Sequence, residues 1–216
     1  MHAVRSGACA MAVALGQMAC HSPVRAPGSV SAEVVSAAIA APLRVLFVGN
    51  SYTYYNNFPE IVAGLSVSAR GSRPIVVKSL TRPGVPLQVY LTSPDLRDSL
   101  AAALKEAHWD YVVLQEQSRL GFRMVNGEPG ISEPQDFFKF ARILNGQIQQ
   151  AGARTAFLLT WADRTHPQDQ DALSAAYMRI GRELGALVIP AGLAWQQVHR
   201  ERPSLDMNEP DRKSVV

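Results

Sequence analysis

From Leu43 onward, short runs of apolar residues alternate with longer segments in which apolar positions recur at helical spacing. The apolar runs are LRVLFVG (43–49), RPIVVKSLT (73–81), DYVVLQEQS (110–118), RTAFLLTWA (154–162) and ALVIPAG (186–192). Continuous apolar runs are typical of strands that are covered on both faces, as in a parallel sheet. We therefore predict five β-strands.

The segments between these runs predict five helices. They cover residues 58–70, 93–109, 133–152, 168–185 and 193–202. Ile61, Leu65 and Val67 or Ser68 give the first segment its helical spacing, and Leu96, Leu100 and Leu104 mark one face of the second. Ser93 is expected to cap the second helix with Pro94 at its first position. Gly152 is expected to close the third.

Strands that alternate with helices predict a three-layer α/β/α sandwich around a five-stranded parallel sheet of the flavodoxin-like type. In such folds ligands bind beyond the carboxyl ends of the strands. The polar residues that follow each apolar run are therefore the candidates for chemistry.

The first run ends in Gly49-Asn50-Ser51, which predicts a nucleophile at the mouth of the sheet. A serine at the start of a helix can attack a carbonyl while nearby backbone N–H groups bind the oxyanion. The alternative is that Ser51 only caps the helix. The motifs of a phosphate-binding loop, of a dinucleotide site and of a Gly-x-Ser-x-Gly elbow are absent from the sequence.

Two further run ends carry candidate donors. Gly84 lies between two prolines after the second run, and its N–H is expected to face Ser51. The third run ends in Gln115-Glu116-Gln117, whose side chains alternate between the two faces of the sheet. An uncharged amide from Gln115 or Gln117 suits an oxyanion site, whereas Glu116 is interpreted as a surface or ion-paired carboxylate.

The ordered set VLFVGNSYT, PG and DYVVLQEQS, followed by TWADR and LVIPAGLAWQQV, resembles the SGNH (GDSL-like) hydrolases, in a bacterial branch with GNS in place of GDS. The resemblance covers Leu43 to about Asp211. It implies an α/β/α serine esterase without a metal or cofactor. By position, Ser51 would be the nucleophile and first oxyanion donor, Gly84 the second, and Gln115 or Gln117 the third.

The resemblance also implies a closing Asp-x-x-His block, in which the histidine deprotonates the serine. Asp211 fits the aspartate, but Ser214 occupies the histidine position and the sequence stops two residues later. A hydroxyl is no base near neutral pH, so we expect a truncated chain with weak or no turnover. The substitute base with the same spacing is His166, in Asp163–His166.

The N-terminus differs from the rest of the chain. Residues 1–20 predict an export signal, with Cys20 as a candidate lipidated cysteine, and residues 21–41 predict a linker to a hydrolase domain at 43–216. Cleavage after VSAAIAA is the alternative. The chain is therefore expected to be periplasmic, secreted or anchored to the cell envelope.

Composition narrows the partners. The net charge is +3 without runs of like charge, so no nucleic-acid partner is expected. Cys9 and Cys20 are the only cysteines, which excludes a thiol nucleophile from residue 43 onward. The expected partner is a small-molecule or carbohydrate ester, with O-acetyl esters suggested by the resemblance. The alternatives are an inactive relative that keeps the pocket and an unrelated flavodoxin-like binding protein.

Overall fold

The computed structural model describes residues 41–121, 123–125, 127–205 and 207. Five parallel strands form one sheet in the order β2-β1-β3-β6-β7. They are β1 (Leu43–Gly49), β2 (Ile75–Thr81), β3 (Tyr111–Leu114), β6 (Arg154–Leu158) and β7 (Leu187–Ile189). The predicted five-stranded parallel sheet is confirmed.

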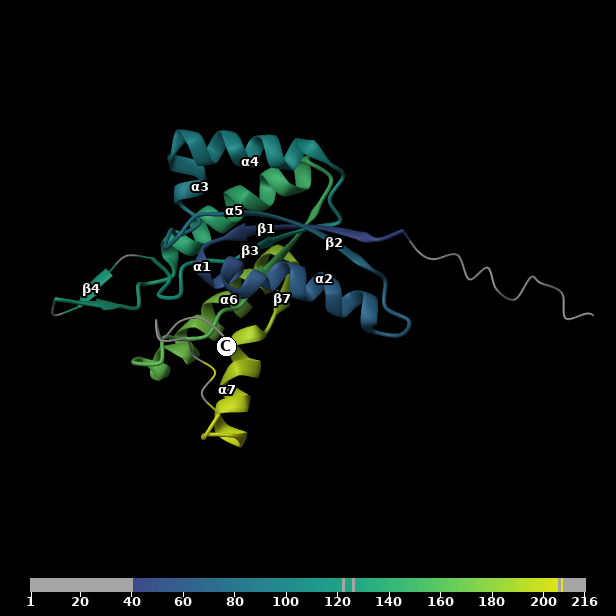
Figure 1. Cartoon of the computed structure of the whole chain (residues 1–216). Coiled ribbons are helices and arrows are strands. Elements are labelled where there is room, and N and C mark those ends of the chain that lie inside the picture. The colour runs from purple at the N-terminus through teal and green to yellow at the C-terminus, as the bar shows by residue number, and fades with distance from the viewer. Residues whose placement is uncertain (1–40, 122, 126, 206, 208–216) are drawn as a thin grey trace, which may run out of the picture. The chain divides into compact units, whose positions relative to one another are not determined.

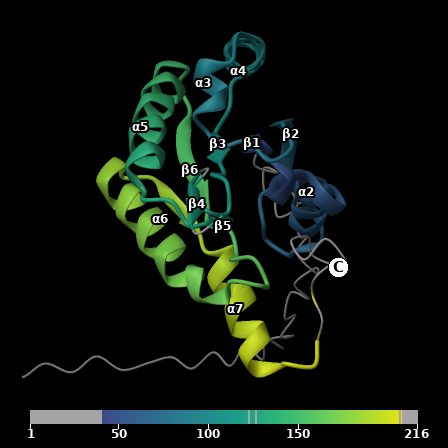
Figure 2. The ribbon, with the colours of Figure 1, turned by 90° about the vertical axis from the view of Figure 1, so that its left-hand side faces the viewer.

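Helices lie on both faces of this sheet (Figures 1 and 2). The long helices are α2 (Phe58–Ser68), α4 (Pro94–Glu106), α5 (Gln135–Gln150), α6 (Gln170–Leu184) and α7 (Ala191–Glu201). Short helical turns are α1 (Ser51–Tyr54), η2 (Tyr55–Asn57), α3 (Val89–Thr92) and η3 (Pro167–Asp169). The five predicted helices are all present, and the α/β/α architecture is confirmed.

The alternation of side chains along β1 builds a core on each face. Leu46 and Val48 join the larger core, under α4, α5 and α6, whereas Val45 and Phe47 join a smaller one with Phe58 of α2. Leu96, Leu100 and Leu104 are buried in the larger core as predicted. The sheet is therefore covered on both sides, which explains its continuous apolar strands.

The predicted apolar face of α2 does not face the sheet. Ile61 and Leu65 are 50% and 64% exposed, whereas Ser66 is buried. Ser66 Oγ donates to the carbonyl of Ala63 at 2.6 Å and accepts from the backbone N–H of Ile75 at 2.9 Å. This hydroxyl ties the helix to the start of β2 and sets its rotation, which helical spacing alone does not reveal.

Two details differ from the sequence predictions. An antiparallel pair, β4 (Arg123–Val125) and β5 (Glu128–Gly130), extends the connection between β3 and α5 and was not predicted. Ser93 stands at the N-cap of α4 without a side-chain capping bond, because its Oγ bonds to Asp95 instead. Gly152 follows α5 with a positive φ of 78°, as a helix-closing glycine does.

Some predictions fall on other parts of the chain. Cys20, the signal and linker, Asp211 and Ser214 lie outside the described residues. Within the described ranges, no helix is long and apolar enough to cross a bilayer. The same residues contain no group of three or more His, Cys, Asp or Glu side chains placed to hold a metal ion.

Candidate active site

Ser51 begins α1, one residue after the end of β1, and is half-buried. Asn50 caps this turn, because its Oδ1 accepts a hydrogen bond from the backbone N–H of Tyr52 at 3.2 Å. The turn lies at the carboxyl end of β1, which is the second strand in the sheet order. The serine therefore stands at the edge where ligands bind in such folds.

Gly49 lets the residues at the end of β3 come close to this turn. Gln115 Oε1 accepts from the backbone N–H of Asn50 and from Thr53 Oγ1, both at 2.8 Å. A Cβ on Gly49 would lie 2.5 Å from Gln115 Oε1 and 2.6 Å from Thr53 Oγ1. Only glycine fits between these two side chains, so Gly49 is what permits this close approach.

We expect Gly49→Ala to destabilise the protein by about 2–4 kcal/mol, because the new methyl group must displace a buried hydrogen-bonded amide. Chemical unfolding measures this change. Gly146→Ala is the matched control, since open space surrounds that helical glycine. An unchanged unfolding midpoint for Gly49→Ala would show that the strand end tolerates the extra atom.

The connections that follow β1, β2, β3 and β6 are the first to fourth crossovers of the sheet. The second crossover is joined to the turn that contains Ser51. Gly84 adopts a positive φ of 70°, the left-handed conformation that glycine tolerates best, and it is exposed. Asn50 Nδ2 donates to the carbonyl of Val85 at 2.9 Å. The residue before Ser51 therefore binds the residue after Gly84, which brings two of the predicted site residues into neighbouring turns.

The two glutamines have different environments. Gln115 is 1% exposed, its Oε1 accepts from Asn50 and Thr53, and its Nε2 donates to the carbonyl of Glu116. Gln117 is half-buried, and its Oε1 accepts from the backbone N–H of Arg119 at 2.6 Å. Gln115 thus organises the end of β1, whereas the Nε2 of Gln117 is left for another acceptor.

Glu116 is buried, not on the surface. It is 2% exposed, and burial raises the pKa of its carboxyl to about 8, with the nearby Asp136 carboxylate adding to the rise. Hydrogen bonds from the backbone N–H groups of Gln117 and Leu87 act in the opposite direction. Glu116 therefore holds its proton at neutral pH, and its interpretation as a surface or ion-paired carboxylate is wrong.

This raised pKa predicts a loss of stability with rising pH. Between the ordinary pKa of 4.5 and about 8, folded Glu116 keeps a proton that the unfolded chain releases. The protonated Glu116 contributes about 3–5 kcal/mol to the free energy of unfolding below the ordinary pKa of 4.5. This contribution is lost as the pH rises to about 8. Glu116→Gln cannot ionise, so its unfolding free energy should lack this fall.

Urea unfolding at pH 5.5 and 8.5 measures the difference, with exposed Glu60→Gln as control. Parallel pH profiles of wild type and Glu116→Gln would contradict it.

The fourth crossover contains Asp163 and His166. The Asp163 carboxylate accepts from Thr165 Oγ1 at 2.7 Å and lies 3.3 Å from Arg119. His166 Nδ1 is 2.9 Å from the same Thr165 hydroxyl. Thr165 therefore lies between the carboxylate and the ring of the predicted substitute base.

Aromatic rings connect this crossover to the serine turn. Tyr52 lies 5.1 Å from Trp161, measured between ring centroids, and Trp161 stacks on Trp195 of α7 at 4.9 Å. The ring of His199 then packs on Trp195 in a T-shaped arrangement, with 5.9 Å between the ring centroids. A pocket of about 370 Å³ adjoins this row and is lined by Ala162, Asp163, Arg164, Pro167, Gln170, Trp195, Gln196, His199 and Arg200. Ring contacts thus run from Tyr52, next to Ser51, to Trp195, which lines this pocket together with polar side chains.

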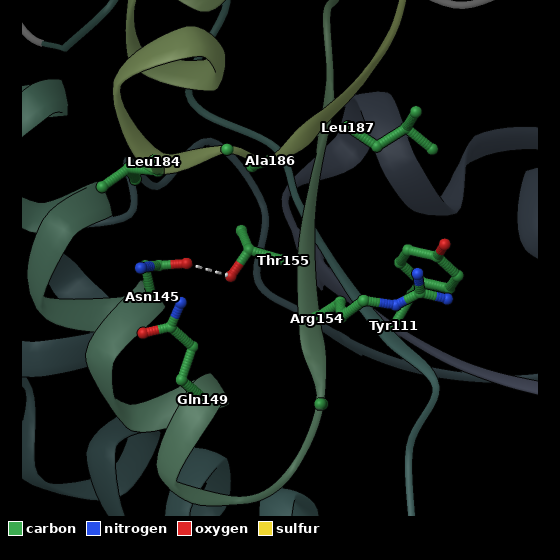
Figure 3. A pocket seen from close by; sticks show the side chains of 10 residues that line it. Tyr111, Asn145, Gln149, Arg154, Thr155, Leu184, Ala186 and Leu187 are labelled. Atoms are coloured by element: carbon green, nitrogen blue, oxygen red, sulfur yellow. Dashed lines mark hydrogen bonds between the residues drawn. The ribbon is translucent and has the colours of Figure 1, made fainter.

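A second pocket, of about 390 Å³, lies at the starts of β3, β6 and β7 (Figure 3). In it, Thr155 Oγ1 donates to Asn145 Oδ1 at 2.7 Å, and the guanidinium of Arg154 lies 4.2 Å from the ring centroid of Tyr111. The amino ends of parallel strands face away from the ligand-binding edge. This pocket is therefore separate from the Ser51 turn.

The sequence did not predict the contacts that hold the site together. Asn50 links the first two crossovers, and Tyr90 donates from its buried hydroxyl to the carbonyl of Gly49 at 2.6 Å. Arg119 and Asp163 link the third and fourth crossovers. Asn50 and Asp163 belong to the predicted motifs, but their bonding partners are far away in the sequence, and nothing local distinguishes Tyr90.

No family model and no curated protein matches the sequence. Solved structures do match the fold. A proposed SGNH hydrolase from Slackia heliotrinireducens is 21% identical with a TM-score of 0.65, over 81% of this chain and 91% of that one. The acetyl xylan esterase AlAXEase is 16% identical with a TM-score of 0.56, over 81% and 92%.

A third structure agrees with these two. The esterase EstA from Pseudoalteromonas sp. is 15% identical with a TM-score of 0.53, over 80% of this chain and 87% of its own. At these identities the similarity is one of fold. The described domain therefore has the fold of the SGNH hydrolases, as the order of its sequence motifs predicts.

Proposed function

We propose that this chain carries an acyl-ester hydrolase site with Ser51 as the nucleophile. The observation that carries the proposal is the linkage of three crossovers at one sheet edge. Asn50 joins the serine turn to the loop of Gly84, and Glu116 joins that loop to Gln117. A hydroxyl and several N–H donors gathered at the carboxyl ends of strands suit acyl transfer.

In the proposed reaction, Ser51 Oγ attacks the ester carbonyl and its proton passes to a base. The carbonyl electrons move to oxygen, and the oxyanion accepts hydrogen bonds from the N–H groups of Ser51 and Gly84 and from Gln117 Nε2. The C–O bond then breaks and the alcohol leaves with the proton. Water hydrolyses the acyl-serine, which releases the acid and restores the hydroxyl.

The weak point of the site is its base. Ser214 stands where the family pattern has histidine, and a hydroxyl does not accept protons near neutral pH. His166, on the fourth crossover, is the substitute candidate. We therefore propose slow turnover, and we expect His166→Ala to remove what remains if this ring is the base.

A carbohydrate O-acetyl ester is the proposed substrate class. The pocket beside the aromatic row offers Trp195 and several polar side chains, a combination that suits a sugar ring. One structural neighbour is named as an acetyl xylan esterase, which supports the same class for this chain.

The test is a comparison of acyl groups and alcohols. Purified protein is incubated with p-nitrophenyl acetate, p-nitrophenyl decanoate and acetylated xylo-oligosaccharides, and released acid is measured. We expect acetate release to exceed decanoate release. Faster release from the decanoyl ester would contradict the proposed substrate class, and no release from any ester would contradict hydrolysis.

Ser214 also favours a second candidate function, a non-catalytic relative that keeps the pocket for binding. Calorimetric titration with acetylated xylo-oligosaccharides separates the two. Binding without any acetate release over hours supports the binding module, whereas acetate release supports the esterase.

A further inference from the structure

Glu116 makes contacts that a surface carboxylate would not make. Its Oε1 accepts from the backbone N–H of Gln117 at 2.6 Å, and its two oxygens lie 3.3 and 3.2 Å from the N–H of Leu87. Leu87 is fully buried, so its N–H needs a partner within the protein. A buried carboxyl is costly, and here it satisfies two backbone donors from different segments.

These two donors lie close to the proposed oxyanion donors. Leu87 follows Gly84 by three residues, and the other N–H belongs to Gln117 itself. Val85, which lies between Gly84 and Leu87, is held by Asn50. The loop is therefore held at one point from the serine turn and at a second point by Glu116.

The backbone of Glu116 is itself held by a hydrogen bond to α6. Its N–H donates to the hydroxyl of Tyr177, a fully buried residue of α6, at 2.9 Å. Asp136 and Glu133 line a pocket of about 130 Å³ that Glu116 also lines. The titratable groups near Glu116 are thus Tyr177 of α6, Asp136 in the first turn of α5, and Glu133 just before that helix.

We propose that Glu116 is a positioning residue for the oxyanion hole, which sets the spacing of the Gly84 and Gln117 donors through the backbone N–H groups of Leu87 and Gln117. This inference rests on the proposed function. Glu116 is buried and acts through two backbone N–H groups, so its removal should affect the reaction step more than substrate binding.

Three substitutions separate this role from a merely structural one. Glu116→Leu keeps the volume but leaves two buried N–H groups without an acceptor. Glu116→Asp withdraws the carboxyl by one methylene, and Glu116→Gln keeps an oxygen that both N–H groups can reach. Asp136→Asn, which lines the same small pocket, is the matched control.

The measurements are kcat and KM for p-nitrophenyl acetate at pH 6.5. We expect Glu116→Leu to lower kcat about 10–100-fold with KM within about 3-fold, because small displacements of positioned donors have effects of this size. Glu116→Asp should show a smaller fall in kcat. Glu116→Gln and Asp136→Asn should stay within about 3-fold of wild type.

Amide hydrogen exchange provides a readout that does not need activity. Exchange in residues 82–88 should rise in Glu116→Leu and Glu116→Asp, while exchange in β1 stays as in wild type. If Glu116→Leu does not fold, Glu116→Asp carries the same comparison. Unchanged kcat and unchanged exchange in residues 82–88 in a folded variant would overturn the proposal, as would an equal loss of kcat in Glu116→Gln. A different result would separate this proposal from the proposed function. If wild type hydrolyses no ester but exchange in the Glu116 variants still rises in residues 82–88 alone, the proposed function is overturned and the contact of Glu116 with this loop is supported.

Discussion

We expect Ser51→Ala to abolish covalent labelling by a fluorophosphonate probe, with intact-mass spectrometry showing no adduct where the wild-type chain gains one. Such probes react with serines whose oxygen is activated and whose neighbours bind the developing charge. Ser51 is half-buried and begins α1, and Asn50 beside it bonds to the loop of Gly84, so among the described serines we expect Ser51 to react, at a rate limited by its weak base. Labelling should fall by more than about 100-fold, since no other group replaces the nucleophile.

Ser99→Ala is the matched control for this experiment. Ser99 is an exposed serine of α4, and its Oγ donates to the carbonyl of Asp95 at 2.7 Å. Its loss should leave labelling at the wild-type level. If Ser51→Ala is still labelled at the same rate, Ser51 is not the nucleophile, and the oxyanion donors assigned around it are wrong as well.

Ser214→His is expected to raise kcat/KM for p-nitrophenyl acetate by about 10²–10⁴, the usual contribution of a positioned general base. The reason is spacing, because Asp211 and position 214 then complete the Asp-x-x-His block that the family resemblance implies. Asp211 orients the new ring in this scheme, so Asp211→Asn in the Ser214→His background should remove most of the gain. Both positions lie outside the described residues, and the prediction rests on the sequence.

Ser214→Ala controls for any effect of losing the hydroxyl and should leave the rate unchanged. Steady-state rates across pH 5–9 add a second check, since a histidine base gives a rate that rises through its pKa near neutrality. An unchanged rate and a flat profile in folded Ser214→His would show that the absent histidine is not what limits turnover.

The apolar runs and helical segments alone determined the layers of this protein. Each strand of the five-stranded sheet and each long helix follows a local pattern, so five parallel strands with helices on both faces follow from reading along the chain, whereas the short β4–β5 pair does not. The position of Ser51 also follows locally, because the run ends at Gly49 and the polar residues come next. Gly84 was found in the same way, from a turn between two prolines.

Tertiary structure decided which polar atoms at the strand ends are occupied. Gln115 and Gln117 alternate with Glu116 in sequence, yet hydrogen bonds to Asn50 and Thr53, 65 and 62 residues away, occupy the Gln115 oxygen. The bond from Leu87 to Glu116 spans 29 residues. Contacts at such separations depend on the order of strands in the sheet, which no local pattern contains. For the same reason, Ser66 and the start of β2 set the rotation of α2, whereas its apolar spacing did not.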